Sequence, residues 1–369
     1  MLASCGASAD VDSSAEPKGA AYTVDEFGSY KEPWAAAFVP GTSMLVINEK
    51  AGTIKAINTE TGDEMSVSGA PVVDFGGQGG LGDIAFLPTK AVGADGSRTI
   101  YLSWVEAGNG DTRGAVVGKG KFACDDSACE ISDLSVIWQQ TPKVTGRGHY
   151  SHRIRFSPDG QYLFIASGDR QKLDPAQENS NTLGTIVRLN LDGTPAAGNP
   201  MADQPAPTNQ IWSYGHRNIL GMDWDAQGRL WGMEHGPAGG DELNLVAAGA
   251  NYGWPTRSNG NHYSGDPIKD HSADDGFTKP AVHWTPVIAP GDMIFYSGDM
   301  FAAWQGDALI ASMAEPGLVR VKINGDSAAE AKRYSFENRI RSIDQGPDGA
   351  LWLLEDGDDG RLLKLTAKQ

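Results

Sequence analysis

Short apolar runs alternate with turns along most of this chain, and one phrase recurs. In each copy an apolar run enters a glycine-containing turn, a second apolar run leaves it, and a third strand follows. The copies occupy residues 38–50, 86–106, 156–170, 224–237, 301–317 and 345–360. Repeated antiparallel units of this size are typical of propeller blades. We therefore predict an all-β fold, a six-bladed β-propeller of four-stranded antiparallel blades.

The repeats run nearly from end to end, so we expect a single domain over residues 21–369. Residues 1–20 are small and polar, which predicts a disordered tether. The last strand, near 361–366, should pair with an early strand near 20–50, because ring closure hides the sheet edges. The longest irregular stretches are expected at 107–152, 169–183, 192–210 and 250–292. Long loops on a rigid scaffold are where sites usually lie.

The net charge and the cysteines limit the ligands and the cellular locations to be expected for this chain. The formal net charge of −17 argues against nucleic-acid binding, which needs a basic surface. No apolar run is long enough for a spanning helix. Leu2-Ala3-Ser4-Cys5 is like a bacterial lipobox, which predicts a periplasmic or cell-surface protein with a lipid anchor at Cys5, unless the match is chance. Cys124 and Cys129 could form a disulfide or a metal pair, and no second pair has metal-site spacing, which favours the disulfide.

Two histidine-containing segments carry candidate chemistry. His149 precedes the third repeat, and an imidazole on a channel loop is a natural general base, although a lone histidine is more often only hydrogen-bonded. Arg217 and Asn218 lie on a turn before the fourth repeat. The guanidinium suits carboxylate or quinone oxygens and the amide suits a cofactor or substrate oxygen, while loop bracing by the arginine is the alternative.

Two further segments suggest a cation and an anion. Gly236-Pro237 would expose backbone carbonyl oxygens, which hard cations such as Ca²⁺ accept as ligands. Additional oxygens could come from Asp241, Glu242 and Tyr252. Arg339 and Arg341 alternate in a predicted strand and should share a face, where like charges repel unless an anion or carboxylates lie between them. Gln78 is displayed on a glycine-rich loop that lacks the lysine of a phosphate-binding loop.

Over residues 30–366 the chain resembles the soluble quinoprotein sugar dehydrogenases, in particular the aldose sugar dehydrogenase branch. The segments that carry the resemblance are GQGGLGDIAF (77–86), HYSHRIRF (149–156), YGHRN (214–218), EHGPAGGDELN (234–244), NYGWP (251–255) and NRIRSI (338–343). The family implies a six-bladed propeller that binds pyrroloquinoline quinone (PQQ) through a calcium ion at the channel mouth.

The resemblance also implies roles for the residues named above. His149 would be the general base, Arg217 and Asn218 would hold the quinone, and Gln78 would contact cofactor or substrate. The backbone oxygens of Gly236 and Pro237 would ligate the cofactor calcium. Arg339 and Arg341 would meet the cofactor carboxylates, and Asp241, Glu242 and Tyr252 match positions of a second calcium in relatives.

Two positions depart from the family pattern. Gly148 stands where the glucose dehydrogenases have an aspartate that would orient the base. Ala314 and Glu315 stand where a lysine usually contacts the cofactor, and a glutamate is unfavourable beside a tricarboxylate. We expect oxidation of an aldose at C1 to a lactone, with electrons passed to an external acceptor, by a monomer or dimer. The alternatives are a cofactor-free propeller that binds sugar or polymer and a calcium-dependent propeller lactonase.

Overall fold

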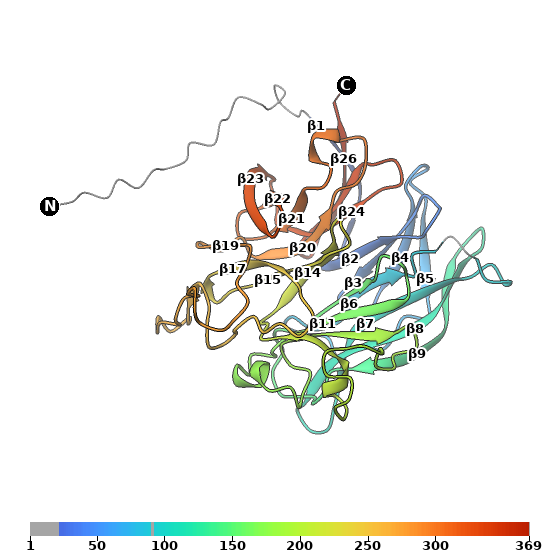
Figure 1. Ribbon diagram of the computed structural model, residues 1–369. Helices are drawn as coiled ribbons and strands as arrows, with labels where there is room; N and C mark the ends of the chain where they lie inside the picture. The colour runs from blue at the N-terminus through green and yellow to red at the C-terminus, as the bar shows by residue number, and fades with distance from the viewer. Residues whose placement is uncertain (1–21, 90–91, 369) are drawn as a thin grey trace.

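The computed structural model of this chain describes residues 22–89 and 92–368, and nearly all of its regular structure is β-strand (Figure 1). The helices described are the short 3-10 turns η2 (Asp174–Gln177), η3 (Thr208–Gln210) and η4 (Ala302–Trp304). The all-β prediction is confirmed. The expected tether over 1–20, with Cys5, lies outside the described residues. None of the helices in 22–89 and 92–368 has the length and apolar character needed to cross a bilayer.

The described strands form several four-stranded antiparallel sheets and one larger sheet. The first contains, in spatial order, β1 (Tyr22–Tyr30), β26 (Gly360–Ala367), β25 (Leu351–Glu355) and β24 (Ile340–Gln345). The second contains β10 (Ser151–Phe156), β11 (Tyr162–Ser167), β12 (Thr185–Asn190) and β13 (Ile211–Tyr214). The third contains β14 (Ile219–Trp224), β15 (Leu230–Glu234), β17 (Asp241–Leu245) and β19 (Val282–Trp284). The fourth contains β20 (Pro290–Phe295), β21 (Ala308–Ser312), β22 (Gly317–Asn324) and β23 (Ser327–Ser335).

The larger sheet joins two antiparallel halves through a short parallel contact between β5 and β9. One half contains β2 (Pro33–Phe38), β3 (Met44–Glu49), β4 (Ile54–Asn58) and β5 (Glu64–Ser68). The other contains β6 (Leu81–Phe86), β7 (Arg98–Ala107), β8 (Arg113–Cys124) and β9 (Cys129–Gln139). A small ribbon of β16 (Ala238–Gly239) and β18 (Gly260–Asn261) lies outside these sheets.

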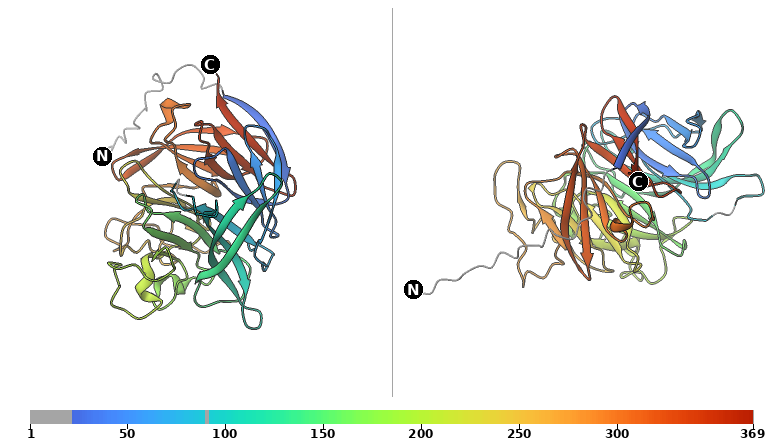
Figure 2. Two further views of the ribbon diagram at one scale, coloured as in Figure 1. Left: turned by 90° about the vertical axis from the view of Figure 1, so that its right-hand side faces the viewer. Right: turned by 90° about the horizontal axis from the view of Figure 1, so that it is seen from above.

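The leading strands of these units form a closed circle of contacts, in the order β2, β6, β10, β14, β20, β24 and back to β2. In Figure 1 the labels of β2, β14, β20 and β24 lie together near the middle, and the outer strands fan away from them. The ring closes as predicted, because β26 pairs with β1 in the register Tyr22↔Ala367 to Tyr30↔Gly360. Figure 2 shows the two strands side by side.

The hydrophobic core lies between neighbouring units. The second strand of each repeat is buried on both faces, as in β21 and β25, and therefore reads as a continuous apolar run rather than an alternating one. One apolar cluster joins Trp231 of β15 to Phe295 of β20, and another joins Leu45 of β3 to Trp352 of β25. Packing between units thus holds the leading strands in their circle.

The prediction of irregular structure throughout 107–152 is wrong. This stretch contains all of β8 and β9, and the turn between them is closed by the predicted Cys124–Cys129 disulfide. β8 contains three glycines. One of them, Gly118, is required by packing, because a Cβ there would come within 2.6 Å of the Trp104 ring.

Candidate functional site

A cavity of about 230 Å³ lies where several leading strands begin. Trp34, His152 and Leu220 contribute from the starts of β2, β10 and β14. Four predicted site residues also line the cavity, namely Gln78, Asn218, Arg339 and Arg341. Beside it, a small crevice is lined by Arg217, Gly236, Glu242 and Tyr252, and His235 lines both spaces. Residues far apart in the sequence therefore meet at one end of the ring.

The imidazole of His149 is buried and held by the carboxylate of Asp169, a residue that the sequence pattern does not mark as part of a site. Its Nδ1 lies 2.7 Å from Oδ1 of Asp169, and Oδ2 of Asp169 accepts a hydrogen bond from Trp254 Nε1 at 2.7 Å. The backbone N–H of Asp169 donates to the carbonyl of Arg217 at 2.9 Å. These contacts leave Nε2 of His149 as the nitrogen available to a ligand.

Burial lowers the pKa of His149 below its ordinary value. The hydrogen bond that Asp169 accepts from the imidazole opposes this shift, and the positive charge of Arg217 adds to it. A lowered pKa keeps the imidazole neutral at neutral pH, which is the state in which it can accept a proton.

The first departure from the family pattern has a structural explanation. A Cβ at Gly148 would meet the side chain of Gln171 at 2.6 Å, so an aspartate there would need Gln171 to move. Arg170 donates to the Gly148 carbonyl at 2.9 Å and stacks on Tyr150, which fixes the loop before His149. The orienting carboxylate comes instead from Asp169, on the adjacent segment after β11.

Arg217 is held by its surroundings and keeps one donor without a partner. Its backbone N–H donates to Glu234, and Nη1 donates to the carbonyl of His235 at 3.2 Å. The guanidinium lies over the rings of Trp254 and Tyr263. The Nε atom is buried and has no hydrogen-bond partner among residues 22–89 and 92–368. Since an unmade bond at a buried donor costs about 1–3 kcal/mol, this atom fits a ligand oxygen.

Asn218 and Gln78 use part of their amides to shape the site. Oδ1 of Asn218 accepts hydrogen bonds from the backbone N–H and hydroxyl of Ser151, both at 3.2 Å, which leaves its NH₂ group as a donor. Oε1 of Gln78 accepts the backbone N–H of His149 at 2.7 Å. Gln78 therefore ties its glycine-rich loop to the segment that carries the imidazole.

The Gly236-Pro237 turn is buried and tightly built. A Cβ at Gly236 would come within 2.3 Å of the carbonyl oxygens of Gly239 and Gly240, so only glycine fits. Oδ1 of Asp241 accepts the Gly236 N–H at 2.8 Å, and Oδ2 accepts the N–H groups of Ile288 and Ala289. Asp241 thus braces the turn, and burial raises its pKa to about 6.

The other residues predicted for a second calcium have partners within the protein. The Tyr252 hydroxyl donates to the Leu245 carbonyl at 2.6 Å, and its ring stacks on His216. Burial raises the pKa of Glu242 well above its usual value, and the nearby Glu234 adds to this. In residues 22–89 and 92–368 no group of three or more His, Cys, Asp or Glu side chains is placed to hold a metal. The second calcium stays a prediction.

Arg339 and Arg341 share a carboxylate that the sequence reading had not identified. Oδ1 of Asp356 accepts bonds from Nε and Nη2 of Arg341, at 2.8 and 2.6 Å, and its Oδ2 lies 3.1 Å from Arg339 Nη2. Arg339 immediately precedes β24 and does not lie within it, whereas Arg341 does. Two positive charges face one carboxylate here, which leaves a surplus of one beside the cavity.

Glu315 stands with Ala314 where the family usually has a lysine, and its side chain is directed away from the cavity. Its side chain is mostly exposed and pairs with Arg333, while Ala314 donates its N–H to the Ile288 carbonyl at 3.0 Å. The neighbouring Met313 lines the cavity instead. The carboxylate therefore does not face the space where an anion would bind.

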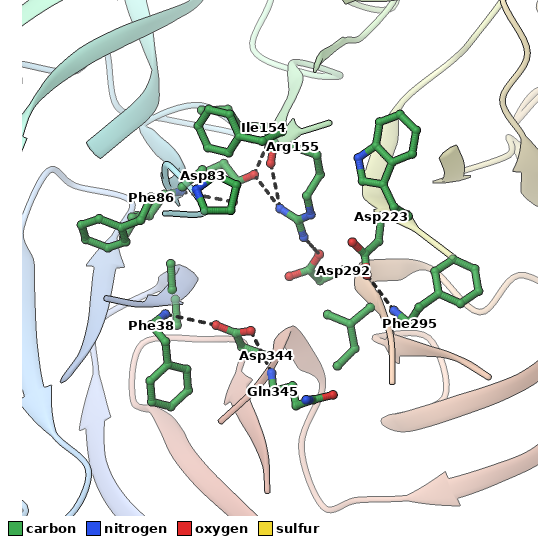
Figure 3. Close-up of a pocket in the computed structure, with 18 of the residues that line it drawn as sticks. Phe38, Asp83, Phe86, Ile154, Arg155, Asp223, Asp292, Phe295, Asp344 and Gln345 are labelled. Atoms are coloured by element: carbon green, nitrogen blue, oxygen red, sulfur yellow. Dashed lines mark hydrogen bonds and ion pairs between the residues drawn. The ribbon is translucent and has the colours of Figure 1, made fainter. Parts of the chain in front are cut away.

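A second cavity, of about 440 Å³, lies where the leading strands end (Figure 3). Asp83, Asp223, Asp292 and Asp344 surround Arg155 there. Several of these carboxylates bind the next strand in the circle. Asp83 accepts the Ile154 N–H at 2.7 Å, Asp223 the Phe295 N–H at 2.7 Å, and Asp344 the Phe38 N–H at 3.3 Å. These hydrogen bonds link the leading strand of one unit to that of the next.

Buried Arg153 contacts residues that line each of the two cavities. Its guanidinium donates to Asp83 at 3.0 Å and to the carbonyls of Leu220 and Gly291, both at 2.6 Å, and lies 4.1 Å from the centre of the Trp34 ring. The charge of Arg153 is balanced by Asp83 and Asp292, so this guanidinium braces residues of both cavities.

Comparisons with known proteins show the family and the fold of the chain. The family model "Glucose / Sorbosone dehydrogenase" matches residues 30–364. The chain is similar to "Aldose sugar dehydrogenase YliI" of Escherichia coli K12, with 35% identity over 91% of this chain and 90% of the relative. A crystal structure of the soluble E. coli aldose sugar dehydrogenase in the apo form matches with a TM-score of 0.86 and 34% identity, over 94% of this chain and 100% of the other. The PQQ-bound aldose sugar dehydrogenase of Streptomyces coelicolor matches with a TM-score of 0.74 and 26% identity, over 95% and 99% of the chains.

Proposed function

The chain belongs to the glucose/sorbosone dehydrogenase family of oxidoreductases, as its resemblance predicted, and we propose that it oxidises aldose sugars at C1 to lactones with PQQ and calcium. The observation that supports this most is the pairing of a neutral, carboxylate-oriented imidazole with a buried arginine that has an unpartnered donor. PQQ, when bound, supplies an electrophilic quinone that takes up the two electrons of the sugar, and electrons then pass to an external acceptor.

His149 would accept the proton of the sugar C1 hydroxyl at Nε2. Asp169 favours the proton on Nδ1, which leaves Nε2 as an acceptor, and it stabilises the imidazolium that forms. Trp254 keeps the carboxylate in place through its indole N–H. These three side chains form one hydrogen-bonded series, so the base is oriented before a substrate arrives.

Arg217 and Asn218 would bind cofactor oxygens with the guanidinium Nε and the amide NH₂. Fixed donors in a dry site stabilise developing negative charge without reorganising. Gln78 would contact cofactor or substrate, and Arg339 and Arg341 would meet cofactor carboxylates with the charge that Asp356 leaves unbalanced. The carbonyl oxygens of Gly236 and Pro237 would ligate calcium, since hard cations take such ligands.

The proposal also covers the number of blades, the domain, the cellular location and a second calcium site. We count six blades, with the larger sheet as two of them, because the circle of leading strands supports this reading. Residues 21–369 would form one domain. Export to the periplasm or cell surface is supported by the disulfide, and anchoring at Cys5 is proposed from the lipobox-like sequence alone. Asp241, Glu242 and Tyr252 remain the proposed surroundings of a second calcium.

The test is reconstitution of the purified protein with PQQ and Ca²⁺, followed by dye reduction with a panel of aldoses. We expect sugar-dependent reduction, and a loss of about 10²- to 10⁴-fold in kcat for His149→Ala, the usual contribution of a general base. Unchanged turnover in that variant would remove His149 from its role. Absence of PQQ binding and dye reduction would favour a cofactor-free sugar-binding propeller, and lactone hydrolysis without PQQ would favour a lactonase.

A further inference from the structure

Lys50 places its ammonium group at the same cavity as Arg339 and Arg341, although it lies in a different repeat. It follows β3 directly and lines the cavity together with Gln78. Only 16% of its side chain is exposed. Nζ lies 3.0 Å from Oε1 of Glu32 and donates to the carbonyl of Gly77 at 3.2 Å. A lysine held this closely at a cavity wall is part of a built site.

The backbone of Lys50 is fixed on both sides. Its N–H donates to the Glu32 carbonyl at 3.1 Å, and its carbonyl accepts the N–H of Leu81 at 2.8 Å. A Cβ at Gly80 would come within 2.2 Å of the Lys50 carbonyl oxygen, so the glycine-rich loop approaches as closely as a glycine allows. The backbone position of Lys50 is therefore set by the fold, and the contacts with Glu32 and Gly77 then direct its ammonium group.

The charges at the cavity do not cancel. Three cations line it, namely Lys50, Arg339 and Arg341, and their ion pairs use two carboxylates, Glu32 and Asp356. The Glu32 side chain is 30% exposed, so its attraction for Lys50 is partly screened by water. A cavity with a surplus of positive charge favours an anionic ligand.

We propose that Lys50 is a cofactor-binding residue that contacts a carboxylate of the bound quinone, so that the cation missing at Ala314 and Glu315 is supplied from the first repeat. This inference rests on the proposed function, because it takes PQQ as the anion. Lys50 has three donors and uses two of them in the contacts above, which leaves one for the ligand. The competing reading is that Lys50 only anchors the loop of Gln78 through the Gly77 carbonyl.

The experiment measures PQQ affinity directly. PQQ is titrated into the full chain with saturating Ca²⁺, and binding is followed by quenching of tryptophan fluorescence, which Trp34 at the cavity should report. Lys50→Met removes the charge and keeps an unbranched apolar side chain. We expect its Kd for PQQ to rise by about 10- to 100-fold, the effect of one charge-assisted hydrogen bond. Lys50→Arg should keep Kd within a few-fold.

Two matched controls separate the readings. Glu32→Gln leaves the ammonium free of its carboxylate, so PQQ should bind as tightly or more tightly. Equal weakening in Glu32→Gln and Lys50→Met would show that the Lys50–Glu32 ion pair acts on binding only by holding the site together. Lys55→Met removes a cation from β4 that pairs with Glu64 away from the cavity, and should not change Kd. Thermal unfolding of every variant checks the fold, and Lys50→Gln replaces Lys50→Met if the latter does not fold.

The outcomes are distinct. Weaker binding for Lys50→Met with unchanged Glu32→Gln and Lys55→Met supports the proposal. An unchanged Kd for Lys50→Met, or equal losses for Lys50→Met and Glu32→Gln, overturns the role of Lys50 and leaves the proposed function intact. Failure of the unsubstituted protein to bind PQQ overturns the proposed function and this inference with it.

Discussion

Replacing Asp169 with asparagine tests whether the buried carboxylate prepares His149 as a base. Asp169 is completely buried. Its Oδ1 accepts the Gln171 N–H at 2.8 Å and pairs with Nδ1 of His149, and its Oδ2 accepts the Trp254 indole N–H at 2.7 Å. An asparagine has nearly the same shape, so the change removes the charge and one acceptor without leaving a cavity.

The asparagine cannot satisfy all three neighbours. With its oxygen toward His149, its NH₂ group faces the donor of Trp254, and an unmet buried donor costs about 1–3 kcal/mol. With the amide reversed, Nδ1 of His149 must accept a hydrogen bond, so the proton moves to Nε2 and the base is in the wrong tautomer. In either orientation the imidazolium formed during catalysis loses its anionic partner. A charge-assisted hydrogen bond contributes about 1.5–3 kcal/mol, so we expect kcat to fall by about 10- to 100-fold.

The assay is dye reduction by PQQ-loaded Asp169→Asn with saturating aldose, alongside a PQQ titration. Affinity for PQQ should stay within a few-fold, because Asp169 acts through His149 and not on the cofactor. The pKa of His149 should fall further, since its hydrogen bond with Asp169 raises it in the parent. Asp192→Asn, on an exposed turn, is the matched control. Unchanged kcat in Asp169→Asn, or an equal loss in Asp192→Asn, would refute the reasoning.

Three further predictions follow from burial and cross-linking. The acidic limb of kcat/KM against pH should have its midpoint below 6.5, because the pKa of His149 is lowered and the base stays neutral to lower pH; a midpoint above 6.5 would contradict this. Burial raises the pKa of Asp344 to about 7, so its folded form keeps a proton that the unfolded chain releases near pH 4, and its contribution to stability falls as pH rises from about 4 to 7. Asp344→Asn should therefore raise the unfolding free energy relative to the parent, by up to a few kcal/mol, and more at pH 8 than at pH 5. Thermal unfolding at the two pH values measures this, and an equal gain at pH 5 and pH 8 would count against the prediction. Replacing both Cys124 and Cys129 with serine should lower the unfolding free energy by about 2 kcal/mol in chemical denaturation and leave dye reduction unchanged, because neither cysteine lines the cavity or the crevice of the site.

The sequence predicted those parts of the fold that local pattern controls. The repeated apolar runs indicated the second strands, such as β21 and β25, because burial between two neighbouring units makes every position apolar. It also indicated the pairing of β26 with β1. It missed β9, which has an exposed face and alternates weakly. The register of an outer strand depends on partners that lie far away in the chain.

Candidate site residues were predictable where the residue type itself carries the chemistry, as for His149 and Arg217. Partners were not. Asp169 lies 20 residues after His149, and nothing in the local pattern says that its carboxylate turns back to the imidazole. Asp356 and Lys50 reach the site from separate repeats, so their proximity to it follows from ring closure and not from spacing. The sequence suggested that the Glu315 carboxylate would lie beside the cofactor, but in the structure this side chain pairs with Arg333 and does not line the cavity.

A crystal structure of the protein grown with PQQ and Ca²⁺ tests the central claim most directly, namely that groups from distant repeats form one cofactor site. We predict that the cofactor occupies the cavity beside His149, with its carboxylates at Lys50, Arg339 and Arg341, and that a calcium ion is bound to the carbonyl oxygens of Gly236 and Pro237. Cofactor bound on another face, or at this cavity without contact to Arg217 and without a metal at the Gly236-Pro237 turn, would contradict the account.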